Sequence, residues 1–183
     1  MESVRATRAV RPAAGLLVLA ALAGLGLRPE PLLAQEGGRD EADRDVVALL
    51  RIHEELIRAH VENLPDLWTS LETDEYVSVN GGSVSFPSPV ERRDGRRAYL
   101  QAARFTRYED VREPLVRIST DGTLGWLIAE VAVAGTLPAA DGSLEAFDEV
   151  WAWIELYERT PDGWKLVGNA SNRRPGDDAA GER

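Results

Sequence analysis

The chain has 183 residues, a length that suits a single domain. It is acidic, with 21 basic and 31 acidic residues, and it carries no basic patch of the kind that binds nucleic acid or an anionic membrane surface. There is no cysteine, which excludes a disulfide framework, a thiolate nucleophile and a cysteine-ligated metal site. We therefore expect no nucleic acid among its partners.

The N-terminal segment has the features of an export signal. Arg5, Arg8 and Arg11 precede a short apolar run, AAGLLVLAALAGLGL, and the small residue Ala34 follows two prolines. This order is typical of a secretory signal peptide, so we predict that residues 1–34 are removed on export. An uncleaved membrane anchor is the alternative, although the run is short for a membrane span. We expect a secreted or periplasmic protein that has no membrane contact after cleavage.

The next segments predict two helices. Residues 35–44 (QEGGRDEADR) are polar and contain glycine, so they indicate a flexible lead-in. Across residues 45–64 apolar side chains recur at the spacing of one helix face, with Asp45 as an N-cap. Pro65 breaks this helix, and PDLWTSL, with a proline at its first position, predicts a second, short helix.

A strand and a third helix follow. DEYVSVNGG alternates polar and apolar residues before a glycine turn, which places Tyr76 and Asn80 on one face of a strand. Residues 91–105 predict a helix that is charged on one side and carries Tyr99 on the other. The basic stretch of this helix is interpreted as a solvent-exposed face, and it consists of Arg92, Arg93, Arg96 and Arg97.

From residue 110 onward the hydrophobic period changes to two, which predicts four strands. Their sequences are VREPLVRIST, TLGWLIAEVAVAGTL, LEAFDEVWAWIELYERT and WKLVGNASNR, separated by DG, PAADGS and PDG. All three separators favour hairpins. Residues 175–183 predict a disordered tail. Helices followed by a long antiparallel meander indicate an α+β fold, in which helices cover one face of a curved sheet.

The turn of the last hairpin determines which way its tryptophans face. The sequence TPDG fits a type I turn closed by a glycine bulge. The resulting cross-strand pairs are Thr160–Trp164, Leu156–Gly168 and Ile154–Ala170. In this register Trp164 faces the core, and the opposite face mixes aromatic with charged side chains, as a partly hydrated interface does. We therefore predict a homodimer whose interface consists of Trp151, Trp153, Glu155 and Tyr157.

At this point the chain resembles a known family. AWIELYERTPDGWKLV resembles the last hairpin of the nuclear transport factor 2-like superfamily, and IRAHVENLPDLWTSLETDEYVSVNGG resembles the start of its SnoaL-like bacterial members. The resemblance assigns residues 45–174 to this domain. It implies a cone, also described as cystatin-like, in which a curved antiparallel sheet wraps around the N-terminal helices. It further implies an apolar pocket and, in many members, dimerisation through the outer sheet face.

The resemblance leaves the activity open, because family members include isomerases, cyclases, dehydratases and binding proteins without known chemistry. His53 and His60, the only histidines, are seven residues apart and share one helix face. Either is a candidate acid or base in the pocket. His60 also matches a histidine that is common at this point in SnoaL-like relatives. The alternative is that both are helix histidines at the edge of the core, and two histidines are too few for a metal site.

Glu130 is the only charge in TLGWLIAEVAVAGTLPAA, a strand that is otherwise apolar on both faces. A carboxylate buried there would have a raised pKa and would suit general acid–base chemistry. Trp126 shares its face. The alternative is that Glu130 points outward, into a hydrated dimer interface. The predicted pocket therefore consists of His53, His60, Tyr76, Asn80, Tyr99, Trp126 and Glu130.

Three functions are compatible with this sequence. The first is binding of a small, largely apolar molecule in the cone without catalysis. The second is an isomerase or cyclase that uses Glu130 or His60 as proton carrier. The third is a structural dimer with no ligand. We expect neither a cofactor nor a metal, because the sequence has no phosphate loop, zinc motif or dinucleotide fingerprint.

Overall fold

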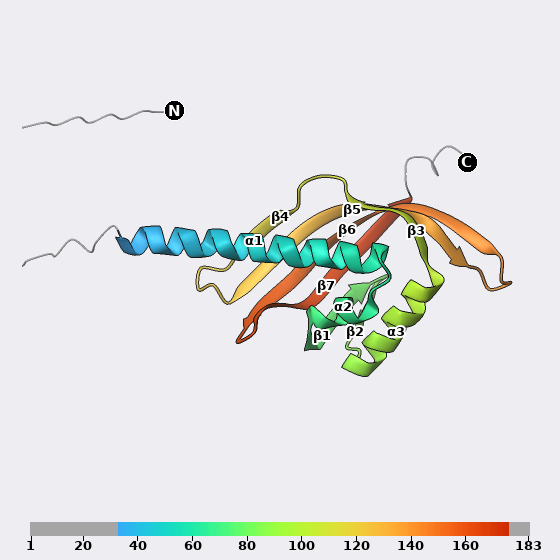
Figure 1. The fold of residues 1–183 in the computed structure, drawn as a ribbon, viewed down its shortest axis with the longest axis horizontal. Helices are drawn as coiled ribbons and strands as arrows, with labels where there is room; N and C mark the ends of the chain where they lie inside the picture. The colour runs from blue at the N-terminus through green and yellow to red at the C-terminus, as the bar shows by residue number, and fades with distance from the viewer. Residues whose placement is uncertain (1–32, 176–183) are drawn as a thin grey trace, which may run out of the picture. The chain divides into compact units, whose positions relative to one another are not determined.

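The computed structural model describes residues 33–175, which form an α+β fold (Figure 1). Its elements in chain order are α1 (Leu33–Val61), α2 (Pro65–Ser70), β1 (Glu72–Asn80), β2 (Ser83–Ser85), α3 (Pro89–Ala102), β3 (Arg104–Asp110), β4 (Leu115–Ile118), β5 (Leu124–Pro138), β6 (Leu144–Thr160) and β7 (Gly163–Pro175). The predicted signal peptide and tail lie outside the described residues, except for two residues of the former and Pro175.

The strands form one mixed sheet in the order β2-β1-β7-β6-β5-β3, and β4 also pairs with β5. All neighbours are antiparallel except β1 and β7, which are parallel. The prediction of an antiparallel sheet is therefore correct for all pairs but one. Strand β3 was not predicted, because the helical pattern was extended through Phe105, whereas α3 ends at Ala102.

Helix α1 begins earlier than predicted. It starts at Leu33, so the segment 35–44 is helical and the prediction of a flexible lead-in is wrong. Asp45 is accordingly not an N-cap but a buried residue within the helix. Its carboxylate accepts a hydrogen bond from Trp164 Nε1 at 3.0 Å and pairs with Arg159, which attaches α1 to the last hairpin. No helix within residues 33–175 is both long and apolar enough to cross a membrane.

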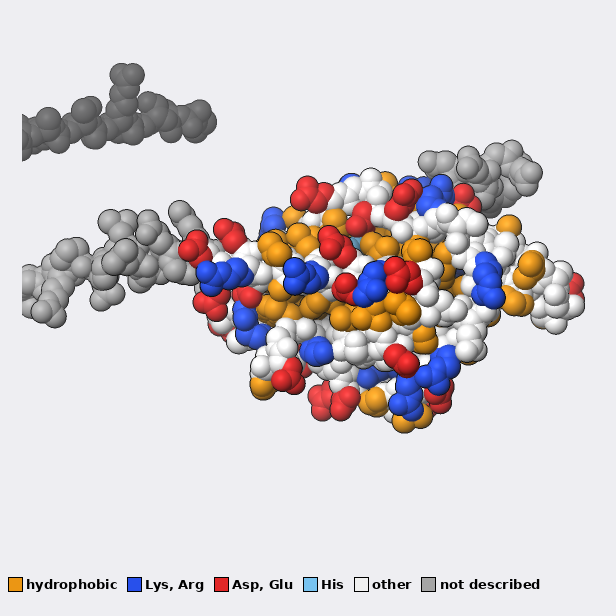
Figure 2. All heavy atoms as spheres, in the orientation of Figure 1, with side chains coloured by type: hydrophobic (Ala, Val, Ile, Leu, Met, Phe, Trp, Pro, Cys, Tyr) orange, Lys and Arg blue, Asp and Glu red, His pale blue; other side chains and the backbone are white. Residues whose placement is uncertain are grey.

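Helix α1 is amphipathic, and its apolar side packs on the sheet. It contacts β3, β4 and β5, and it buries Leu49, His53 and Leu56. Figure 2 shows the charged side chains along the exposed side of this helix, with hydrophobic side chains on both flanks. We call the sheet face that α1 covers the inner face and the opposite one the outer face. The core on the inner face includes Leu127, Val131, Tyr157, Trp164 and Leu166.

The turn of the last hairpin differs from the prediction. Thr160 pairs with Gly163, so the turn has two central residues and the predicted Thr160–Trp164 pair is wrong. Gly163 has a φ of 106°, a conformation that side chains disfavour and glycine tolerates. The predicted pairs Leu156–Gly168 and Ile154–Ala170 are confirmed.

An extra residue further along β7 reconciles these pairings. Tyr157 pairs with Leu166 while Leu156 pairs with Gly168, so Val167 is a β-bulge. The bulge reverses the alternation of side chains, because it inserts one residue into only one of the two strands. Trp164 and Leu166 therefore lie on the same face as Tyr157.

The predicted orientation of the aromatic strand β6 is wrong. Tyr157 is fully buried, Glu155 is 3% exposed, and Trp151 and Trp153 pack partly buried against the same core. These four residues lie on the inner face, so they are not available as the dimer interface that the sequence suggested. The outer face instead carries the alternate residues of β6, including Ile154 and Leu156.

We expect the contact between Asp45 and the last hairpin to contribute measurably to stability. Asp45→Ala leaves the buried Trp164 N–H without an acceptor, which should lower the free energy of unfolding by about 1–3 kcal/mol. Urea denaturation measures this loss. Asp43→Ala, an exposed change on the same helix, is the control and should have little effect. Equal effects of the two substitutions would contradict the assignment.

Candidate functional site

A cavity of about 950 Å³ lies between the helices and the inner face of the sheet. Aromatic side chains from elements far apart in the sequence line it, and they are His60, Trp68, Tyr76, Tyr99, Tyr108, Phe147, Trp151 and Trp153. Among the predicted pocket residues, those that line the cavity are His53, His60, Tyr76, Asn80 and Tyr99. A volume of this size is typical of a small-molecule site.

Glu130 and Trp126 do not line the cavity, so their prediction as pocket residues is wrong. The side chains of β5 alternate, and both residues belong to the outer set. The Glu130 carboxylate pairs there with Arg112 and lies 3.6 Å from Arg174. A carboxylate that is partly exposed and paired with arginines does not have the environment of a pocket acid or base. The alternative reading, in which Glu130 points outward, is the correct one.

A buried carboxylate, Glu155, organises the inner end of the cavity. Its Oε1 accepts a hydrogen bond from Trp153 Nε1 at 2.8 Å and lies 2.9 Å from His53 Nδ1. Its Oε2 accepts a hydrogen bond from the Tyr157 hydroxyl at 2.5 Å. A buried charge is tolerated only when several donors replace water, and here three side chains do so.

His53 lies between two carboxylates. Its Nε2 is 3.1 Å from Asp110 Oδ1, and its Nδ1 faces Glu155. Burial alone would lower the pKa of His53, but hydrogen bonds and charge from Glu155 and Asp110 together outweigh it and raise the pKa to about 9. His53 is therefore an imidazolium at neutral pH, with both N–H groups already engaged. This arrangement stabilises the fold and leaves no free nitrogen for proton transfer.

His60 has the opposite character. Its Nδ1 lies 2.7 Å from the Leu56 carbonyl oxygen, so this nitrogen carries the proton and Nε2 does not. Its ring lies between Trp68 and Tyr108, with centroid distances of 4.0 and 4.5 Å. Burial lowers the pKa of His60 to about 4, and the charge of Arg96 adds to this effect. His60 is thus a neutral hydrogen-bond acceptor, and Nε2 has no partner within residues 33–175.

Three tyrosine hydroxyls also belong to the cavity. Burial raises the pKa values of Tyr76, Tyr99 and Tyr108, so all three remain neutral donors at physiological pH. Tyr108 was not found from the sequence, because strand β3, which carries it, was not predicted. The same strand delivers Asp110 to His53.

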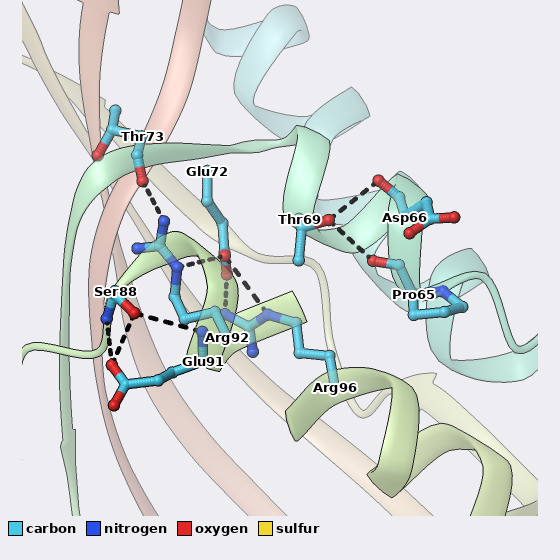
Figure 3. Close-up of polar contacts among 9 residues, drawn as sticks. All are labelled: Pro65, Asp66, Thr69, Glu72, Thr73, Ser88, Glu91, Arg92 and Arg96. Atoms are coloured by element: carbon cyan, nitrogen blue, oxygen red, sulfur yellow. Dashed lines mark hydrogen bonds and ion pairs between the residues drawn. The ribbon is translucent and has the colours of Figure 1, made fainter. Parts of the chain in front are cut away.

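The wall formed by α3 carries a buried charge cluster, shown in Figure 3. The Glu72 side chain is completely buried and pairs with Arg96 and with Arg92, whose Nε is 3.4 Å from Oε2. The Arg96 guanidinium lies over the Trp68 ring at 4.0 Å. The expected solvent-exposed face is therefore correct for Arg93 and Arg97 but wrong for Arg92 and Arg96. The burial of these two arginines could not be predicted, because their partner Glu72 precedes the predicted strand.

Comparisons with known proteins identify the fold but not the function. No family model matches the chain, and no curated protein matches it. Solved structures do match. They include a nuclear transport factor 2-like protein of unknown function in nutrient uptake from Rhodospirillum rubrum, with 22% identity over 68% of this chain and 96% of that one and a TM-score of 0.56.

Two further neighbours carry names that suggest chemistry. A ketosteroid isomerase-like protein from Erwinia carotovora atroseptica has 12% identity and a TM-score of 0.57 and covers 72% of this chain and 98% of its own. A putative dehydratase from Streptomyces avermitilis has 16% identity and the same TM-score and covers 73% and 99%. Likeness at this identity establishes a nuclear transport factor 2-like fold, and the predicted cone of helices and curved sheet is confirmed.

The two carboxylates around His53 predict a specific pH dependence of stability. Its pKa is raised from 6.5 to about 9 by folding, so its contribution is complete below pH 6.5 and is lost as the pH rises through 9. The loss should be on the order of 1.4 kcal/mol per unit of pKa shift. Chemical denaturation from pH 6 to 10 measures it.

His53→Gln should flatten this profile, because the titrating group is gone. His60→Phe is the matched control and should leave the slope intact, since His60 titrates near pH 4. A wild-type profile that stays flat between pH 6 and 9 would show that the imidazolium is not stabilised by its neighbours.

Proposed function

We propose that this protein binds a small, largely apolar molecule in the cavity and holds it without chemical change. The observation that carries this proposal is the cavity itself, in which many aromatic rings surround His60 Nε2, a neutral acceptor without a hydrogen-bond partner among residues 33–175. Binding sites for small molecules combine apolar walls with a few oriented polar groups in this way. The open volume also argues against a purely structural dimer, which would need no cavity.

An isomerase or cyclase is the second candidate, and the names of two structural neighbours motivate it. Neither predicted proton carrier supports it. Glu130 faces outward in an ion pair, and a base with a pKa of about 4 takes up a proton poorly at neutral pH. His53 holds both of its protons against carboxylates. Binding therefore explains the arrangement with fewer requirements than catalysis does.

The role of His60 can be tested with two probes of equal shape. 2-Naphthol carries a hydroxyl donor and naphthalene does not, so the wild type should prefer 2-naphthol by about 1 kcal/mol, which is about fivefold in affinity. His60→Phe keeps an aromatic ring between Trp68 and Tyr108 but removes the acceptor. It should abolish the preference while retaining naphthalene binding. Equilibrium dialysis gives both constants.

Each negative result has a different meaning. If neither compound binds the wild type, the proposal of a small-molecule site is wrong. If His60→Phe retains the preference for 2-naphthol, the site exists but its acceptor lies elsewhere. Val90→Ala, at an exposed position of α3 that does not line the cavity, is a control that should bind both probes normally.

A homodimer is proposed as well, now through the outer face of the sheet. Trp126 pairs with Leu156 and Ile128 pairs with Ile154 across β5 and β6, and all four are between 37% and 45% exposed. These neighbouring pairs form one apolar patch, and such patches commonly mark interfaces. A second copy of the chain is the proposed occupant, because the family resemblance implies dimerisation through this face.

A charge in the outer patch and the same charge elsewhere on the surface should have different effects on the dimer. Trp126→Asp places a charge in the outer patch and should convert the dimer to a monomer, as measured by sedimentation equilibrium. Val61→Asp, at a more exposed apolar position at the end of α1, should leave the mass unchanged. A monomeric wild type, or a dimer that survives Trp126→Asp, would refute the interface.

A further inference from the structure

We propose that the ligand is an apolar, ring-bearing monocarboxylic acid whose carboxylate binds to Arg92 and Arg96 at the α3 wall of the cavity. This inference rests on the proposed binding function and narrows the class of ligand. Its basis is a surplus of buried positive charge together with buried donors that have no acceptor.

The charges at this wall do not balance. Glu72 is the only carboxylate within 4.0 Å of either guanidinium among residues 33–175, so one close negative charge pairs with two positive ones, while Asp74 acts on Arg92 from farther away. Glu91, the next acidic residue of α3, is engaged elsewhere, because its carboxylate accepts hydrogen bonds from the backbone and hydroxyl of Ser88. Buried charge without a partner is unfavourable, so this wall is completed best by an anion.

The hydrogen bonds at the same place are also incomplete. The Arg92 side chain is 5% exposed, and only its Nη2 is satisfied, by the Thr73 carbonyl oxygen at 2.7 Å. Its Nη1 and Nε have no hydrogen-bond acceptor, and neither has the buried Thr73 hydroxyl a partner. In Figure 3 the guanidinium of Arg92 has a nitrogen without a dashed contact, on the side away from Glu72. Two nitrogens of one buried guanidinium thus lack a hydrogen-bond acceptor, although Nε lies 3.4 Å from Glu72 Oε2, whereas buried donors are normally paired.

The location of Arg92 and Arg96 suits a carboxylic acid that carries an aromatic ring. Arg92 and Arg96 both line the cavity, and the Arg96 guanidinium lies over the Trp68 ring. Trp68 in turn lies 4.0 Å from His60, so the guanidinium groups border the aromatic part of the cavity. A planar guanidinium matches the two oxygens of a carboxylate, which makes an acid a better fit than a neutral polar group. The ligand ring then lies on the aromatic side chains.

The inference is tested with 2-naphthoate and 2-naphthamide, which share shape but differ in charge. The wild type should bind the acid at least about tenfold more tightly than the amide at neutral pH, because hydrogen bonds to charged groups are the stronger ones. Arg92→Met should abolish this preference while Glu72 keeps Arg96 as its partner. Arg93→Met removes the same charge from the exposed side of α3 and should retain the preference.

The possible failures are distinguishable. If naphthalene binds but the acid and amide bind equally, the carboxylate site is wrong and the binding function stands. If no naphthalene derivative binds, both proposals fail together. An equal loss of preference in Arg93→Met would indicate a general charge effect and would also overturn the site. The comparison of acid and amide on the wild type remains decisive even if Arg92→Met does not fold.

Discussion

The position of α1 on the sheet depends on the burial of a single carboxylate, that of Glu155. A carboxylate in the interior must be surrounded by donors, and the three that surround it come from His53 on α1 and from Trp153 and Tyr157 on its own strand. Asp110 on β3 holds the other side of the histidine. This network of ionic hydrogen bonds joins α1, β3 and β6, so the helix cannot rotate or slide without breaking it.

The second attachment of α1 lies two turns earlier, where Asp45 contacts Trp164 and Arg159 on the last hairpin. Two polar contacts on one helix face fix both its rotation and its position along the axis, which hydrophobic contact alone does not. The cavity is a consequence of this placement. His60 lies two turns beyond His53 on the same face, and both line the cavity together with residues of α2 and α3.

The sequence predicted the elements of this fold better than it predicted their faces. Hydrophobic period identified the helices and the long strands, since period depends only on local geometry. The predicted orientation of the β6 side chains was wrong, because Glu155 was taken as a marker of the solvated side. A charged residue is a poor marker when donors that are distant in sequence enclose it. His53 and Asp110 are 57 residues apart, and no local pattern links them.

The candidate site was predictable to the extent that helix spacing determines it. His53 and His60 share a face by simple geometry, and both line the cavity. Their opposite protonation was not predictable, because it depends on two carboxylates beside one ring and aromatic rings beside the other. The prediction for Glu130 was wrong for the same reason as that for Glu155, because its partners are distant in sequence. They are arginines from the segment before β4 and from β7. Contacts between residues distant in sequence decided each case.

The bulge at Val167 is a single inserted residue that affects the local twist of β7. It is the one residue of β7 between Leu166 and Gly168, and it has no partner on β6. Deleting Val167 would leave Leu166 facing inward and Gly168 facing outward, as ordinary alternation requires. A deletion within 169–174 would instead move the side chains beyond the deletion to the opposite face of the sheet. A bulge also increases the local twist of a strand. A single codon at this position therefore sets how strongly β7 twists, while every buried contact of the hairpin retains its identity.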